Sequence, residues 1–217
     1  MTETFSSGGT DLFEYDLYQA WKSGNVFERF FHCRRIDEVQ SLLTELRDPA
    51  ILDYGCNTGT FVIALTSRGY RIAGFDISKA NIERAQAYGQ AAQKNIEWFL
   101  DTLPERRWDC ILLTNVLEYV IDKQSVMKNV LRHLNPDGSV IVSLANPGHP
   151  YIRFAAIRQL FSNRDKHDIA QSEPSDKLKA KELLRLFKDH GFFCTRRKHG
   201  LGWVNTHFVF QRTVFSI

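Results

Sequence analysis

The stretch that decides the fold is Ile51-Leu52-Asp53-Tyr54-Gly55-Cys56-Asn57-Thr58-Gly59-Thr60. A short apolar strand pattern runs into a turn with two glycines, and a helical pattern starts directly after it. Gly55 and Gly59 allow the backbone to approach a ligand closely, and the N-terminus of the following helix presents unpaired N–H groups. The stretch therefore predicts a ligand-binding turn between a strand and a helix.

A second feature is Asp76, which ends the next apolar run and lies 21 residues after Gly55. The carboxyl ends of neighbouring parallel strands meet at one edge of a sheet, and a carboxylate there can accept hydrogen bonds from both hydroxyls of a ribose. The two features together predict a ligand that contains a nucleoside, without saying which one.

The spacing of the glycines disfavours two phosphate-binding patterns. Asn57 stands where the dinucleotide pattern G-x-G-x-x-G has its second glycine, and no lysine follows Gly59 as it does in the P-loop. A nicotinamide-dependent oxidoreductase on the same kind of sheet stays open as an alternative, but the missing central glycine argues against it.

Helix and strand patterns alternate through most of the chain. This order predicts a doubly wound α/β fold: a mostly parallel, seven-stranded, Rossmann-like sheet that closes with an antiparallel strand pair at its C-terminal end. A type I turn is expected at residues 135–138. We expect strands at 50–54, 71–75, 96–100, 109–114, 139–144, 192–197 and 207–215, and helices at 26–46, 58–68, 78–93, around 126–134, at 151–161 and at 177–190.

Composition bounds the class of protein. With 217 residues, 43% hydrophobic and 24% charged, the chain has the make-up of one globular domain and not of a disordered or fibrous protein. No apolar run is long enough to span a membrane, and the N-terminal residues lack the pattern of a signal peptide, so we expect a cytoplasmic protein. Four separated cysteines without a C-x-x-C pair predict buried thiols and no metal site.

Charge is distributed unevenly along the chain. Residues 1–150 hold 15 Lys and Arg against 19 Asp and Glu, whereas residues 151–217 hold 13 against 6. A basic C-terminal third is compatible with an anionic substrate, with nucleic acid, or with a solvated surface that has no special partner.

The chain resembles class I S-adenosylmethionine-dependent methyltransferases in four places that follow in the family's order. The resemblance is closest to the small-molecule branch that includes ubiquinone-biosynthesis-type and sugar-modifying enzymes. It implies S-adenosyl-L-methionine as cofactor, S-adenosyl-L-homocysteine as product, and a small-molecule acceptor methylated on O or N. The four places are Ile51 to Gly59, Gly74-Phe75-Asp76-Ile77-Ser78, the fourth-strand segment 108–120, and the segment 131–142 that leads into the fifth strand.

The resemblance also implies roles for individual residues. The methionine end of the cofactor would lie among residues of the first motif, the ribose at Asp76, and the adenine against Ile77 with its amino group near Asp101 and Thr102. The methyl-transfer side would be lined at the end of the fourth strand. Apart from the resemblance, the aromatic N-terminal stretch with Tyr18 is expected either to fold as a lid over cofactor and acceptor or to pack as an amphipathic helix onto the sheet, and we carry the lid forward. With Tyr18 included, the expected cofactor-binding set is Asp53, Gly55, Cys56, Asn57, Gly59, Asp76, Ile77, Asp101, Thr102, Asn115, Val116 and Tyr18.

We expect a single domain, residues 1–217, made of four parts. Residues 1–48 form a helical cap or lid, 49–145 the cofactor-binding core, 146–177 an insertion at the acceptor site, and 178–217 the closing helix and hairpin.

The catalytic residues are less clear than the cofactor site. Tyr119 stands where many relatives carry a histidine, and a tyrosine with its usual pKa near 10 is a poor base at neutral pH. The candidates that we carry forward are His149 and Tyr119, with His167 behind them.

Two alternatives to a small-molecule enzyme stay open. A nucleic-acid methyltransferase would suit the basic end, but the [DNS]-P-P-[YFW] motif of DNA amino-methyltransferases is missing at residues 114–117. A non-catalytic relative that only binds the cofactor is the other alternative. The oligomeric state is not specified by the sequence.

Overall fold

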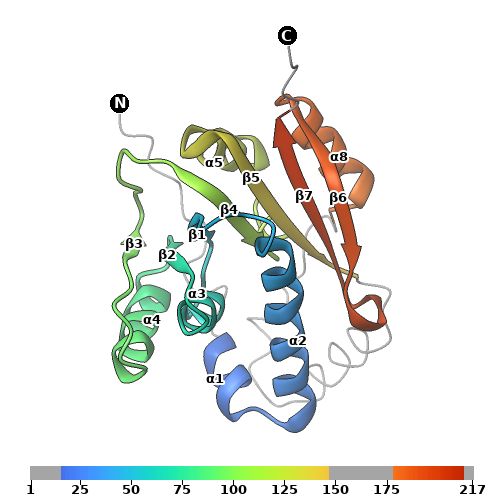
Figure 1. The fold of residues 1–217 in the computed structure, drawn as a ribbon. Helices are drawn as coiled ribbons and strands as arrows, with labels where there is room; N and C mark the ends of the chain where they lie inside the picture. The colour runs from blue at the N-terminus through green and yellow to red at the C-terminus, as the bar shows by residue number, and fades with distance from the viewer. Residues whose placement is uncertain (1–15, 147–177, 213–217) are drawn as a thin grey trace.

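The computed structural model describes residues 16–146 and 178–212, and Figure 1 shows their arrangement. The strands are β1 (Ala50–Tyr54), β2 (Arg71–Asp76), β3 (Trp98–Leu100), β4 (Trp108–Thr114), β5 (Leu134–Ala145), β6 (Phe192–His199) and β7 (Asn205–Arg212). The helices are α1 (Leu17–Ser23), α2 (Val26–Leu43), α3 (Thr60–Thr66), α4 (Lys79–Ala91), α5 (Lys123–Arg132) and α8 (Ala180–Lys188), with a short 3₁₀ turn η1 (Leu201–Trp203).

The seven strands form one sheet in the order β3-β2-β1-β4-β5-β7-β6. β3, β2, β1, β4 and β5 pair in parallel, and β7 lies antiparallel to both of its neighbours, β5 and β6. The predicted fold class, with its closing antiparallel pair, is confirmed. The strand order reverses at β1 and β4, and ligands of doubly wound folds bind where the carboxyl ends of two such strands meet.

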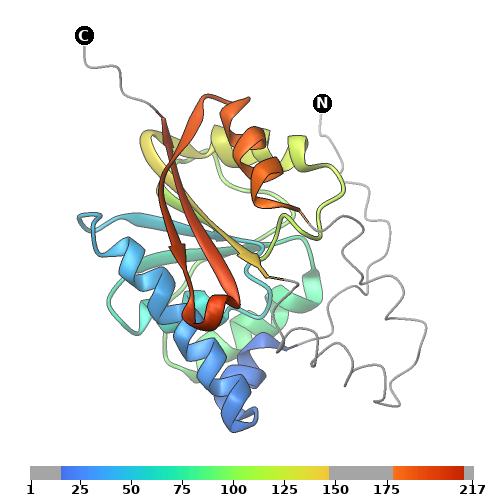
Figure 2. The same cartoon turned by 90° about the vertical axis from the view of Figure 1, so that its right-hand side faces the viewer.

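Helices cover both faces of the sheet, as the view in Figure 2 shows. α2, α3 and α4 pack on one face, where Val39, Val62 and Ile82 join the apolar residues of the strands. α5 and α8 pack on the other face through side chains such as Met127 and Phe187. The central strands are buried on both sides, which explains why they are nearly all apolar in sequence.

α2 begins at a capping box and ends before a proline. The side chain of Asn25 accepts hydrogen bonds from the N–H groups of Phe27 and Glu28, and the Glu28 carboxylate accepts one from the Asn25 N–H. Both contacts satisfy backbone groups that a helix start leaves unpaired. The helix stops at Leu43, three residues earlier than predicted, and the chain then reaches Pro49.

Two sequence predictions were wrong in detail. The expected turn at 135–138 belongs to an irregular part of β5: Leu134 pairs with Trp108, and the ladder continues at Ser139 opposite Cys110. The register shift between Trp108 and Cys110 accommodates residues 135–138, so β5 continues through the segment where the turn was expected. The cysteines are not all buried either, since Cys33 is exposed and Cys194 half-buried. The expected helix 151–161 and nearly all of the insertion 146–177 lie outside the described residues.

Candidate functional site

The loop between β1 and α3, residues 55–59, is called the glycine loop below. Gly55 and Gly59 have φ angles of +78° and +79°, in the left-handed region that favours glycine. The N–H groups of Gly55 and Cys56 both donate to the Phe75 carbonyl of β2, at 2.7 and 2.9 Å. The turn is therefore fastened to the neighbouring strand before any ligand is considered.

Asn57 takes the place of a glycine because it also adopts a positive φ, of +50°. Its side-chain oxygen accepts a hydrogen bond of 2.7 Å from the Thr58 N–H, a local contact that makes asparagine tolerant of this conformation. Its own N–H donates to Asp76 at 2.8 Å. Asn57 thus joins the glycine loop to the end of β2.

The two glycines meet protein atoms rather than open space. A Cβ at Gly55 would lie 2.8 Å from a methyl group of Val116, and one at Gly59 would lie 2.5 Å from the Trp98 ring. Side-chain packing and backbone conformation already require glycine at both positions. A ligand contact is therefore not needed to explain either glycine.

Asp76 is 8% exposed and accepts hydrogen bonds with both of its oxygens. Oδ2 accepts from the Asn57 N–H at 2.8 Å, and Oδ1 accepts from the Ser78 N–H at 2.9 Å. Burial raises the pKa of this carboxyl, while the N–H donors hold it down. Its oxygens retain lone pairs for the hydroxyls of a bound ribose, so its place agrees with the role implied by the sequence.

Asp53 is the most unusual group of the site. It is 1% exposed at the end of β1, and neither of its oxygens has a hydrogen-bond partner among the described residues. Burial, followed by the charge of Asp76, raises its pKa to about 7, although Arg35 acts in the opposite direction. A carboxylate held unpaired in such a place is costly and is a mark of a functional site.

Arg35 of α2 faces the same region, and sequence reasoning missed it. Its Nη2 donates to Asn115 Oδ1 at 2.5 Å, while its buried Nε has no hydrogen-bond partner in the described part of the chain. Burial lowers its pKa, and the charge of Glu118, followed by those of Tyr119, Asp53 and Glu38, raises it. A signal was present in the sequence: Arg35 precedes Val39 and Leu42 by four and seven residues, so this arginine lies on the apolar face of its helix.

Glu118 completes a chain of polar contacts at the end of β4. Its Oε1 accepts hydrogen bonds from Asn115 Nδ2 at 3.2 Å and from the Ala145 N–H at 2.8 Å. Within the described ranges its Oε2 is buried without a partner, and burial raises its pKa. Arg35 is therefore linked to Glu118 through Asn115, and the charges of Asp53 and Glu118 both act on its guanidinium. Each of the three side chains retains a buried atom without a hydrogen-bond partner among the described residues.

Three residues with a positive φ mark the carboxyl edge of the sheet. Asn57, Asp101 and Asn115 follow β1, β3 and β4, with φ angles of +50°, +60° and +57°. Backbone conformations of this kind cluster at functional sites. Next to them, Ile77 is 58% exposed, and Asp101 and Thr102 are also exposed, so these three side chains are open to a ligand.

α1 is tied to the glycine loop and to α4. The Tyr18 N–H donates to Thr58 Oγ1 at 3.0 Å, and the Tyr18 ring stacks on that of Tyr88 with centroids 4.3 Å apart. Asp16 caps α1 and accepts hydrogen bonds from the hydroxyls of Thr58 and Tyr88. The start of the described chain is therefore packed against the glycine loop through Thr58.

Of the two catalytic candidates, Tyr119 lies within the described residues and His149 does not. Tyr119 lies near Glu118 and Arg35, and burial followed by the Glu118 charge raises its pKa, which makes a general-base role harder. His149 and His167 lie outside the described residues. Among the residues that the structure describes, no cluster of three or more His, Cys, Asp or Glu could hold a metal ion, and no helix is long and apolar enough to cross a membrane.

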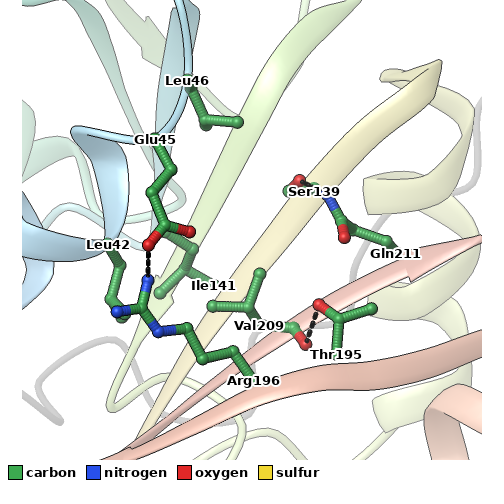
Figure 3. Close-up of a pocket in the computed structure, with 9 residues that line it drawn as sticks. All are labelled: Leu42, Glu45, Leu46, Ser139, Ile141, Thr195, Arg196, Val209 and Gln211. Carbon is green, nitrogen blue, oxygen red and sulfur yellow. Dashed lines mark hydrogen bonds and ion pairs between the residues drawn. The ribbon is translucent and has the colours of Figure 1, made fainter.

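A pocket of about 350 Å³ lies elsewhere, between the end of α2 and strands β5, β6 and β7 (Figure 3). Glu45 and Arg196 form an ion pair at one side, and Gln211 donates to Ser139 at the other. Ser139 pairs with Cys110 near the start of β4, whereas the glycine loop lies at the carboxyl edge. The pocket is thus separate from the candidate site, which depends on the buried polar groups and not on this hollow.

The fold is that of the doubly wound α/β class, with partnerless buried polar groups at the carboxyl edge of its sheet. A methyltransferase-domain family model matches residues 27–197, which is more than half of the chain. The chain belongs to this methyltransferase-domain family.

Curated relatives carry methyltransferase names. The ubiquinone biosynthesis O-methyltransferase of Rickettsia typhi is 29% identical over 62% of this chain and 58% of its own, and that of Rickettsia bellii is 28% identical over 51% and 48%. The chain thus spans about half the length of these curated relatives.

A similar fold occurs in magnesium protoporphyrin IX methyltransferase from Synechocystis with bound S-adenosylhomocysteine. It has a TM-score of 0.67 and 18% identity, and the match covers 90% of this chain and 92% of the other. The glycopeptide N-methyltransferase MtfA has a TM-score of 0.64 and 11% identity, over 84% and 90%. At this identity the likeness supports the fold.

Proposed function

We propose that this protein is an S-adenosylmethionine-dependent methyltransferase that transfers a methyl group to an oxygen or nitrogen atom of a small molecule. The observation that carries the proposal is that buried Asp53 and half-buried Arg35 lie near enough for their charges to act on each other, while both Asp53 oxygens and the buried Arg35 Nε have no hydrogen-bond partner among the described residues. The methionine end of the cofactor carries an ammonium and a carboxylate, so it offers one partner to each.

The residues present fit the whole cofactor. The Arg35 guanidinium would bind the carboxylate, and Asp53 with the free oxygen of Glu118 would bind the ammonium. Asp76 would accept hydrogen bonds from the ribose, and the exposed side chain of Ile77 would pack against the adenine. When bound, the cofactor supplies an electrophilic methyl group on a positively charged sulfur.

The protein's own contribution to the reaction is to position the partners and exclude water. Asn115 and Val116 line the end of β4, where Asn115 is held between Arg35 and Glu118. These residues would help to orient the acceptor, and orientation of the reacting groups is the main source of rate for a direct displacement. An oxygen acceptor must also lose a proton to a general base. His149 stays a prediction for this base, whereas the raised pKa of Tyr119 disfavours Tyr119 in the same role.

The rest of the site follows the same proposal. α1 and the residues before it act as a lid, supported by the contacts of Tyr18 and Asp16 with the glycine loop. The segment 146–177 forms the acceptor wall, because it follows β5 at the carboxyl edge.

Of the two acceptor atoms, oxygen is supported by the O-methyltransferase names of the curated relatives. An anionic acceptor and a cytoplasmic location remain predictions. A nucleic-acid substrate is less well supported, because the cations of β6 contact the protein itself: Arg196 pairs with Glu45, Arg197 lies over the Phe208 ring, and Lys198 contacts Ser41.

Calorimetric titration with S-adenosylhomocysteine, with NADH as the control, tests the cofactor. We expect binding of the first ligand alone. Binding of NADH alone would refute the proposal and restore the oxidoreductase alternative. Transfer of a radiolabelled methyl group to a panel of small phenols and amines then tests catalysis, and binding without transfer to any acceptor would favour the non-catalytic relative.

A further inference from the structure

A buried row of three polar side chains joins three elements that lie far apart in the sequence. Ser143 Oγ of β5 and His207 Nδ1 of β7 are 2.7 Å apart, and His207 Nε2 is 3.1 Å from Glu38 Oε2 of α2. The three residues are 1%, 0% and 5% exposed. A neutral His207 satisfies the row if its Nε2–H donates to Glu38 and its Nδ1 accepts from Ser143, a tautomer assigned from these contacts.

Glu38 also holds the tip of the hairpin between β6 and β7. Its Oε1 accepts a hydrogen bond of 2.7 Å from the Leu201 N–H. A Cβ at Gly200 would lie 2.6 Å from Glu38 Oε2, so this turn has room for the carboxylate only because the residue is glycine. One buried carboxylate thus fastens α2 both to β7 and to the hairpin tip.

The position of Glu38 on its helix links this anchor to the candidate site. Arg35 lies three residues before it, which is the spacing of neighbours on one helix face, and the Glu38 charge acts on the Arg35 guanidinium. Figure 1 shows α2 running past the hairpin tip toward α1.

Apolar packing and the Glu38 hydrogen bonds both hold α2 on the sheet, but they restrict its position to different degrees. Apolar neighbours such as Ile36 and Val39 pack on the sheet without directional preference. Hydrogen bonds to a buried carboxylate have fixed lengths and directions, and they are costly to break. The Glu38 contacts therefore define the rotation and height of α2 more sharply than the apolar packing does.

We infer that Glu38 is a positioning residue: through His207 and Leu201 it fixes α2 on the sheet and so sets the place of the Arg35 guanidinium beside Asn115. The inference rests on the proposed cofactor site, because it assigns the effect of Glu38 on cofactor binding to Arg35. Its hydrogen bonds, and not its charge alone, carry this role.

A double-mutant cycle on affinity for S-adenosylhomocysteine tests the inference. Glu38→Ala is expected to weaken binding about tenfold in the wild-type background but less than about twofold when Arg35→Met is already present, as for neighbours that act as one unit. Glu38→Gln, which can keep both contacts if His207 changes tautomer, should retain most of the affinity. Leu42→Ala, one turn along α2, is the matched control and should lower the melting temperature without changing the affinity.

Equal losses from Glu38→Ala in both backgrounds, or a Glu38→Gln protein as weak as Glu38→Ala, would overturn the inference. If Glu38→Ala does not fold, His207→Asn takes its place in the double-mutant cycle and is expected to show the same dependence on Arg35. The shorter asparagine side chain cannot reach Ser143 and Glu38 at once.

Hydrogen exchange of the α2 amides around Arg35, measured without ligand, gives a second readout. It should be faster in Glu38→Ala and near wild type in Glu38→Gln, and unchanged exchange in Glu38→Ala would also overturn the inference. Absence of binding to the wild-type protein would refute the proposed function instead, and the exchange result would still decide whether Glu38 positions α2.

Discussion

Replacing Asp53 by asparagine changes the group whose electrostatics differ most from those of an ordinary surface carboxyl. The side chain is 1% exposed and has no hydrogen-bond partner among the described residues, and its pKa is raised from 3.8 to about 7. The folded protein therefore keeps a proton that the unfolded chain has released at neutral pH. As a result, protonated Asp53 contributes stability that is fully present below the pKa of the unfolded chain, 3.8. This contribution is lost as the pH rises through the folded-state pKa of about 7.

The size of this loss follows from the shift. A rise from 3.8 to about 7, at 1.36 kcal/mol per pKa unit, corresponds to about 4 kcal/mol of unfolding free energy. Asparagine has nearly the same shape but does not titrate, so Asp53→Asn should escape the loss. We expect the variant to gain on the wild-type protein as the pH rises, by up to about 4 kcal/mol between pH 4 and pH 8.

Urea unfolding of both proteins at a series of pH values measures the difference directly. Titrating groups that do not interact with Asp53 are shared and cancel when the two free energies are subtracted, whereas neighbours such as Asp76, whose charge acts on Asp53, contribute to the difference. A difference that stays constant within about 1 kcal/mol across this range would refute the raised pKa and the argument built on it.

The same substitution should have the opposite effect on the cofactor. Ionised Asp53 attracts an ammonium group, so Asp53→Asn is expected to weaken S-adenosylhomocysteine binding by about tenfold, although it stabilises the free protein. In the wild type, the affinity should rise as the pH passes through about 7, because binding then no longer requires release of the proton. Calorimetry in buffers of different ionisation enthalpy detects the released proton, and an equal pH dependence in the variant would contradict this account.

Three further substitutions test other parts of the site. Arg35→Met should weaken S-adenosylhomocysteine binding by about tenfold or more, whereas Arg29→Met, on the exposed side of α2, should leave the calorimetric affinity unchanged. Asp76→Ala should cost about 1.5 to 3 kcal/mol of binding free energy, and an unchanged affinity would remove this carboxylate from the site. Gly59→Ala should lower the melting temperature more than Gly69→Ala does, since both have a positive φ but only the first would push a Cβ into a neighbouring ring. Equal shifts of the two melting temperatures would show that backbone strain alone matters.

The glycine loop and Asp76 were readable from the sequence because their signals are local. Gly55 and Gly59 follow an apolar strand and precede a helix, and the acidic residue ends the next strand. Such patterns depend on backbone geometry within one strand–helix unit, so they survive without knowledge of the remaining chain.

Arg35, Glu118 and the unpaired state of Asp53 could not be read in the same way. Arg35 approaches Asn115 from a helix that precedes it by 80 residues. Its importance depends on burial, which the fold creates when α2 covers the ends of β1 and β4. The apolar-face spacing of Arg35 was the one local hint.

The sequence by itself determined the fold class, the order of the strands along the chain, the glycine loop and the acidic residue that ends β2, because each is encoded by short-range pattern and backbone preference. The tertiary structure alone decided which charged side chains lose their contact with water. Asp53, Arg35 and Glu38 acquire their raised or lowered pKa values only where helix and sheet bring distant residues together. The directional contacts of the Glu38–His207–Ser143 row arise in the same way. Desolvation depends on this packing and not on residue type, which is why it cannot be read from a local motif.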